Sequence, residues 1–92
     1  MQVGDLITYN VGSGRKSLGL VLDRGDRCKP WESLNNGPLY DCVQVMWHHV
    51  NKLPAGLDMS ERISNRVSAG DIRWYRTKTA SGSSAFSVLS SL

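Results

Sequence analysis

Short stretches in which apolar and polar residues alternate run along the first 76 residues of the chain. This period of two is typical of β-strands with one buried face. The pattern predicts strands at residues 3–9, 18–23, 40–47 and 72–76. Turn-forming residues, including the glycines of Asn10 to Ser17 and the Asn36-Gly37 pair, separate these stretches. The chain is therefore predicted to be an antiparallel, all-β domain.

The same alternation predicts which side chains face the core. On residues 18–23 the three leucines share one face, and on residues 72–76 Ile72 and Trp74 lie opposite Arg73 and Tyr75. Gly19 has no side chain, so another part of the chain can approach closely there. The predicted core is Leu6 or Ile7, Leu20, Leu22, Val43, Val45, Trp47, Ile72 and Trp74.

Two long connections, residues 24–39 and 48–71, interrupt the strands. Trp31 in the first connection is predicted either to fold back over the small core or to anchor an interface. In the second, residues 57–63 fit one short helical turn.

Residues 77–92 differ in kind from the rest, since six of these sixteen residues are serine and Lys78 carries the only charge. The first half is typical of a linker. In the second half, Ala85, Val88, Leu89 and Leu92 fit one helical stripe, whereas Phe86 and Val88 also fit strand alternation. We expect Phe86, Val88, Leu89 and Leu92 to contact another subunit; the alternative is that this tail closes its own barrel.

The length of 92 residues allows one domain with a small core. No apolar run approaches the roughly 20 residues that a membrane span needs. The N-terminal residues lack the basic and apolar regions of a signal peptide, so we expect the chain to be made and kept in a cytoplasm.

The formal net charge of +3 is unevenly distributed. Residues 1–61 carry six basic and seven acidic groups, whereas residues 62–78 carry five basic groups against Asp71 alone. We expect this basic segment, through Arg73 and Arg76, to face an acidic protein surface. A phosphate-facing patch is the alternative, because Arg73 to Arg76 interleave basic and aromatic groups.

The sequence carries little that points to catalysis or metal binding. Cys42 lies in an apolar strand, which is typical of a buried free thiol, and Cys28 lies in a polar connection. His48 and His49 are adjacent, so on a strand they point to opposite faces, and no C-x-x-C spacing occurs. Without a paired carboxylate cluster or a nucleophile motif, we expect no enzyme activity, no metal and no cofactor.

The residues VGDLITY at 3–9, LGLVLD at 18–23, VQVMW at 43–47 and GDIRWY at 70–75 resemble small SH3-like proteins of tailed bacteriophages. The resemblance implies an SH3-like barrel over residues 1–76, followed by a serine-rich tether and apolar tail at 77–92. It also implies a structural protein of the virion, of the capsid cement or head–tail joining type, made in the host cytoplasm. Its partners would be capsid or neck subunits, with several copies in a symmetric assembly. The alternative is a KOW or SH3-like module that binds nucleic acid.

Overall fold

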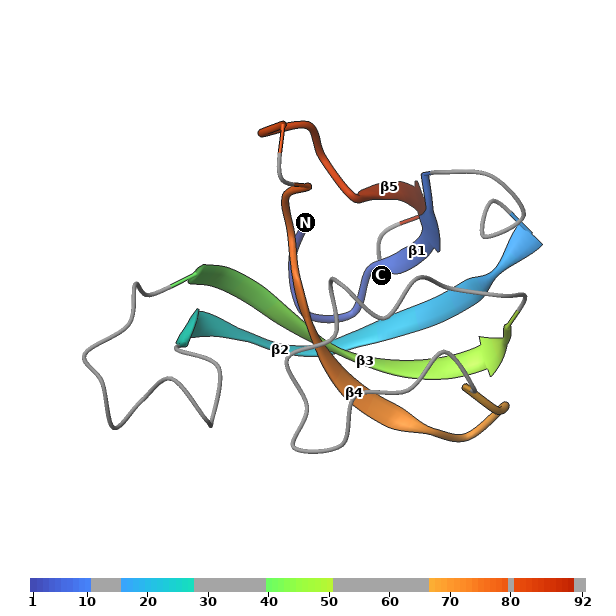
Figure 1. The fold of residues 1–92 in the computed structure, drawn as a ribbon. Coiled ribbons are helices and arrows are strands. Elements are labelled where there is room, and N and C mark those ends of the chain that lie inside the picture. Colours follow the sequence, from blue (N-terminus) through green and yellow to red (C-terminus); the bar gives the residue numbers. More distant parts are fainter. Residues whose placement is uncertain (11–15, 28–39, 51–66, 80, 91–92) are drawn as a thin grey trace.

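A computed structural model describes residues 1–10, 16–27, 40–50, 67–79 and 81–90 of the chain. It contains five β-strands and, within the described residues, no helix that could span a membrane. The strands are β1 (Leu6–Tyr9), β2 (Leu18–Arg27), β3 (Tyr40–His49), β4 (Ile72–Arg76) and β5 (Phe86–Ser90) (Figure 1). The predicted all-β fold is confirmed. Within residues 77–92, for which a helix and a strand were both open, residues Phe86–Ser90 form β5.

The strands make one antiparallel sheet in the order β4-β3-β2-β1-β5, so the last strand returns to lie beside the first. The sheet is curled. Three strands separate β4 from β5 in the sheet, yet the Phe86 ring of β5 lies only 5.7 Å from the Tyr75 ring of β4. Figure 1 shows β1 and β5 lying over the other three strands. In the described residues β4 and β5 are not paired, so the sheet is not closed.

Two turns of the same construction introduce β1 and β4. In each, a glycine with a φ near 90° precedes an aspartate: Gly4-Asp5 and Gly70-Asp71. The aspartate carboxylate accepts a hydrogen bond from the backbone N–H three residues earlier, at 2.8 Å from Gln2 and 2.9 Å from Ser68. The glycine N–H donates to the neighbouring strand, to Val21 in one turn and to Trp47 in the other. Positive φ at the third turn position explains why both need glycine.

The core is built around four aromatic rings that contact one another: Tyr9, Trp47, Tyr75 and Phe86. Most of these contacts are edge-to-face, the arrangement that aromatic quadrupoles favour. The remaining buried apolar residues of this cluster are Ile7, Val21, Val43, Val45 and Ala85. The predictions for Ile7, Val43, Val45 and Trp47 are confirmed.

The predicted inner face of β2 is wrong. Val21 is 1% exposed, whereas Leu20 and Leu22 are only half-buried. The register explains this result, because Gly19 lies opposite Trp47 and Val21 opposite Val45, which are both core residues. A Cβ at Gly19 would lie 2.5 Å from a Val45 methyl and 2.9 Å from the Trp47 ring. The close approach at Gly19 is therefore made by the Val45 methyl and the indole ring together.

The predicted inner face of β4 is also wrong. Tyr75 is 2% exposed and lies opposite Val43, whereas Ile72 is 53% exposed and Trp74 is half-buried. The Trp47 indole N–H donates a 2.8 Å hydrogen bond to the Tyr75 hydroxyl. A buried indole needs an acceptor, and only the face that carries Tyr75 supplies one.

Candidate functional site

The predicted partner-binding tail forms an edge strand whose residues are not all accessible. Phe86 is 4% exposed and packs into the core of its own chain, so its side chain is not a free contact surface. Val88 and Leu89, in contrast, are 46% and 56% exposed. Leu92 and Trp31 lie outside the described residues, as do Cys28 and the helical turn predicted at residues 57–63.

The segment between β4 and β5, predicted as a linker, contains a hydrogen-bonded turn. Thr79 N–H donates to the Ser83 carbonyl at 2.8 Å, and Lys78 pairs with Ser84 in a β-bridge. Ala85, directly before β5, bonds to the residue after β4 and to the residue after β1: its N–H donates to the Thr77 carbonyl and its carbonyl accepts from the Asn10 N–H, both at 2.8 Å. These bonds hold β5 against its own domain.

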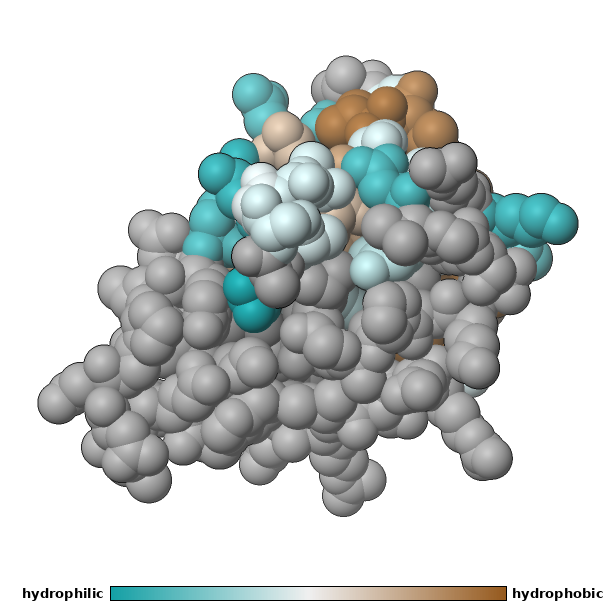
Figure 2. All heavy atoms as spheres, turned by 45° about the horizontal axis from the view of Figure 1, so that its top comes forward, coloured by the Kyte–Doolittle hydropathy of each residue, from teal (hydrophilic) through white to brown (hydrophobic). Residues whose placement is uncertain are grey.

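The described residues with large, exposed hydrophobic side chains are Val3, Ile72, Val88 and Leu89. Two of them are neighbours on β5, whereas Ile72 lies at the start of β4 on the opposite edge of the sheet. Figure 2 shows hydrophobic atoms gathered in one part of the face that it draws, with hydrophilic atoms beside them. Because β4 carries exposed Ile72 and β5 carries exposed Val88 and Leu89, the two edge strands are the candidate contact surfaces.

The two edge strands differ in charge. The sequence of β5, FSVLS, contains no charged residue and no proline. The sequence of β4, IRWYR, contains Arg73 and Arg76. Charged side chains and prolines are devices by which edge strands avoid pairing with another chain. By charge alone, β5 is the edge less protected against pairing among the described strands, although its short length and its bulge beside β1 also discourage pairing.

The predicted basic surface is only partly present in the described residues. The Arg73 side chain is 15% exposed and lies 3.7 Å from the Asp71 carboxylate, so most of it is covered by its own chain. Arg76 is half-buried, and Lys78 is exposed. Arg62 and Arg66 lie outside the described residues. Arg73 therefore contributes less to a free basic face than the sequence suggested.

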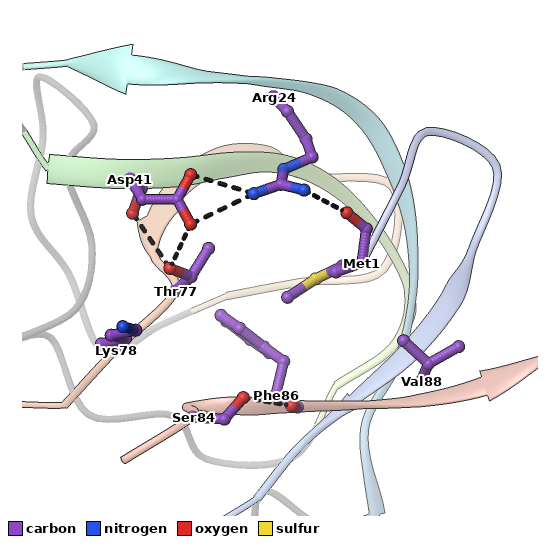
Figure 3. A pocket seen from close by; sticks show the side chains of 8 residues that line it. All are labelled: Met1, Arg24, Asp41, Thr77, Lys78, Ser84, Phe86 and Val88. Atoms are coloured by element: carbon purple, nitrogen blue, oxygen red, sulfur yellow. Dashed lines mark hydrogen bonds and ion pairs between the residues drawn. The ribbon is translucent and has the colours of Figure 1, made fainter. Parts of the chain in front are cut away.

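A small pocket lies at the end of the curled sheet where β5 faces β2 and β3; we call it the end pocket (Figure 3). Its volume is about 270 Å³. Phe86, Val88 and Met1 supply its apolar wall, and its polar residues are Arg24, Asp41, Thr77, Lys78 and Ser84. Sites for drug-sized ligands usually exceed about 300 Å³, so the end pocket suits one or two side chains.

Asp41 organises the polar side of the end pocket. One guanidinium nitrogen of Arg24 contacts both carboxylate oxygens, at 3.0 and 3.1 Å, while the other donates to the Met1 carbonyl at 2.6 Å. The Thr77 hydroxyl donates to the same carboxylate at 2.8 Å. Burial by itself raises the pKa of Asp41, but these hydrogen bonds and the charges of Arg24 and Lys78 outweigh it, so the pKa is lowered. No pattern in the sequence indicated this cluster, because its members come from separate strands.

The other candidate chemistry is limited. Cys42 is a buried free thiol, as predicted, and its S–H donates to the Gly25 carbonyl at 3.0 Å. His48 and His49 are both exposed at the end of β3. Among the described residues, no group of three or more His, Cys, Asp or Glu side chains is placed to hold a metal ion.

Comparisons of the chain with protein-family models, with curated proteins and with solved structures found no match.

Proposed function

We propose that this protein is a non-enzymatic structural component of a phage particle that binds neighbouring virion subunits through the free edge of β5. The observation that carries the proposal is the uncharged edge strand with Val88 and Leu89 exposed side by side. Such an edge presents backbone groups and apolar side chains to an extended segment of another chain.

Two further features support this proposal. The five-stranded antiparallel sheet curls so that rings of β4 and β5 meet, which is a step towards the barrel that the sequence resemblance implies, although the sheet is not closed in the described residues. The link through Ala85 fixes β5 to the domain, so the strand is held ready for a partner without a large ordering cost. A small domain with an exposed edge strand can act through geometry alone, without a cofactor.

Particle association tests the proposed function. Phage particles from cells that express the chain are purified on a density gradient and probed with an antibody raised against the purified domain. We expect the chain to sediment with the particles in a constant ratio to the major capsid protein, and immunogold labelling to place it at a defined position. A chain that stays entirely in the unassembled fraction would contradict the proposal.

Binding to nucleic acid is measured in parallel, since the sequence left that function open. Tight binding of the isolated domain to one DNA or RNA sequence, with affinity falling steeply as salt rises, would favour the nucleic-acid module instead.

A further inference from the structure

The apolar wall of the end pocket continues the core to the outside. Phe86 and Val88 are two residues apart on β5, so their side chains lie on the same face of that strand. Phe86 is 4% exposed and Val88 is 46% exposed, and both line the end pocket together with Met1 (Figure 3). An exposed apolar wall that adjoins the core is a place where an apolar side chain from outside can be buried.

The polar side of the end pocket carries a surplus of positive charge. Arg24 is paired with the Asp41 carboxylate at 3.0 Å, and the same carboxylate accepts the Thr77 hydroxyl at 2.8 Å. Among the described residues, no carboxylate forms an ion pair with the exposed Lys78 side chain, whose charge acts on Asp41 only over a longer distance. Two cations therefore stand against one anion among the pocket side chains, and Lys78 is the cation without an ion-pair partner.

Lys78 and the apolar wall are held close to each other. Lys78 pairs with Ser84 in a β-bridge, and the Ser84 hydroxyl donates to the Phe86 carbonyl at 2.8 Å. The turn between them is closed by the 2.8 Å hydrogen bond from the Thr79 N–H to the Ser83 carbonyl. This arrangement exists before any ligand binds, so little ordering is needed on binding. It suits a ligand that carries an apolar group and a carboxylate side by side.

A nucleic acid fits the end pocket less well than a protein. A phosphate next to Arg24 would meet the like charge of the Asp41 carboxylate. Phe86 is 4% exposed, so its ring offers no open face on which a base could stack. The volume of about 270 Å³ suits a branched side chain.

From these observations we infer that the end pocket binds an apolar side chain of a partner protein, with a carboxylate of that residue or its chain neighbour paired with Lys78. The inference deepens the proposed function and rests on it, since it states which chemistry of a neighbouring subunit the domain recognises beside β5. The site does not require a strand to pair with β5. An ion pair at an exposed lysine is weak, so burial of the apolar side chain supplies most of the affinity and the carboxylate adds selectivity.

N-acetyl-leucine is the probe, because it places one branched apolar side chain beside one carboxylate. Titration of the purified chain is followed by the NMR shifts of backbone amides. We expect saturable shifts at Thr77, Lys78, Ser84 and Val88, with a Kd of about 1–10 mM, as is usual for a ligand this small. N-acetyl-leucinamide, which lacks the charge, should bind about threefold more weakly. N-acetyl-alanine, which lacks the branched side chain, should bind more weakly than N-acetyl-leucine as well.

Substitutions separate the two parts of the site. Lys78→Gln should lower the affinity for N-acetyl-leucine to that for N-acetyl-leucinamide and leave the affinity for the amide unchanged. Lys16→Gln is the matched control, because Lys16 is also exposed but does not line the end pocket, and this variant should bind as wild type does. Val88→Thr puts a hydroxyl in place of a methyl in the apolar wall and should weaken the binding of both leucine compounds. The melting temperature of each variant shows whether it is folded.

The inference would be overturned if the four amides showed no saturable shift up to about 20 mM probe, a concentration well above the expected Kd. Equal losses of affinity in Lys78→Gln and Lys16→Gln would overturn it as well, since they would show a general attraction of charges. Particle association is measured separately. A chain that joins particles without binding the probe would remove only the end-pocket site, whereas a chain that binds the probe but stays unassembled would remove only the proposed function.

Discussion

The hydrogen bond between Trp47 and Tyr75 should make a large contribution to the stability of this small domain. The indole nitrogen and the phenol oxygen are 2.8 Å apart, and the two residues are 1% and 2% exposed. Tyr75→Phe removes the acceptor and keeps the ring. The indole N–H is then buried without a partner, because the surrounding side chains are apolar rings and aliphatic groups.

The expected loss follows from that burial. An unsatisfied buried donor costs about 1–3 kcal/mol. For a domain of this length, each kcal/mol lowers the melting temperature by about 4–8 °C. The edge-to-face contacts of the ring at residue 75 remain, so the effect comes from the loss of the hydroxyl and not from the loss of the ring. Urea denaturation followed by circular dichroism measures the free energy of unfolding, and the Trp47 indole N–H signal in an NMR spectrum should shift.

Tyr9→Phe is the control for this measurement. Tyr9 is 4% exposed and belongs to the same aromatic cluster, but its hydroxyl has no hydrogen-bond partner in the described part of the chain. Removal of the Tyr9 hydroxyl leaves no other group without a hydrogen-bond partner, so the free energy of unfolding should change by less than about 0.5 kcal/mol. If Tyr75→Phe were as stable as wild type, or if both variants lost the same stability, the hydrogen bond would not be the cause.

Three further predictions test the core and the end pocket. Gly19→Ala places a methyl 2.5 Å from Val45 and should cost about 1–3 kcal/mol in urea denaturation, whereas Gly25→Ala, with nothing within 4 Å, should be neutral. Val45→Asp buries an unpaired charge and should unfold the domain; an unchanged melting temperature would remove Val45 from the core. The pKa of Asp41 is lowered in the folded state, so the ionised carboxylate stabilises the domain above about pH 5, and this stabilisation is lost as the pH falls through the folded-state pKa. Asp41→Asn should therefore have a lower free energy of unfolding than wild type at pH 7, and the difference should shrink in acid. A difference that stays constant with pH would contradict this explanation.

The sequence by itself determined the fold class and the positions of four of the strands. Alternation with a period of two and positive-φ glycines are local properties, so they can be read without knowing what lies across the sheet. Residues 72–76 were predicted with the bounds that β4 has, and the buried side of β3 was predicted correctly because its apolar face is unambiguous.

The inner faces of β2 and β4 were decided only by the tertiary structure. On each strand the more apolar face by sequence is the one that lies outward, because the large ring of Trp47 requires a glycine opposite it and a hydroxyl within reach. Gly19 satisfies the first need and Tyr75 the second, and the leucines of β2 and Ile72 then fall on the other side. The end pocket likewise depends on how β2, β3 and β5 are brought together. Register and packing are properties of residue pairs distant in sequence, so a single strand's pattern does not contain them.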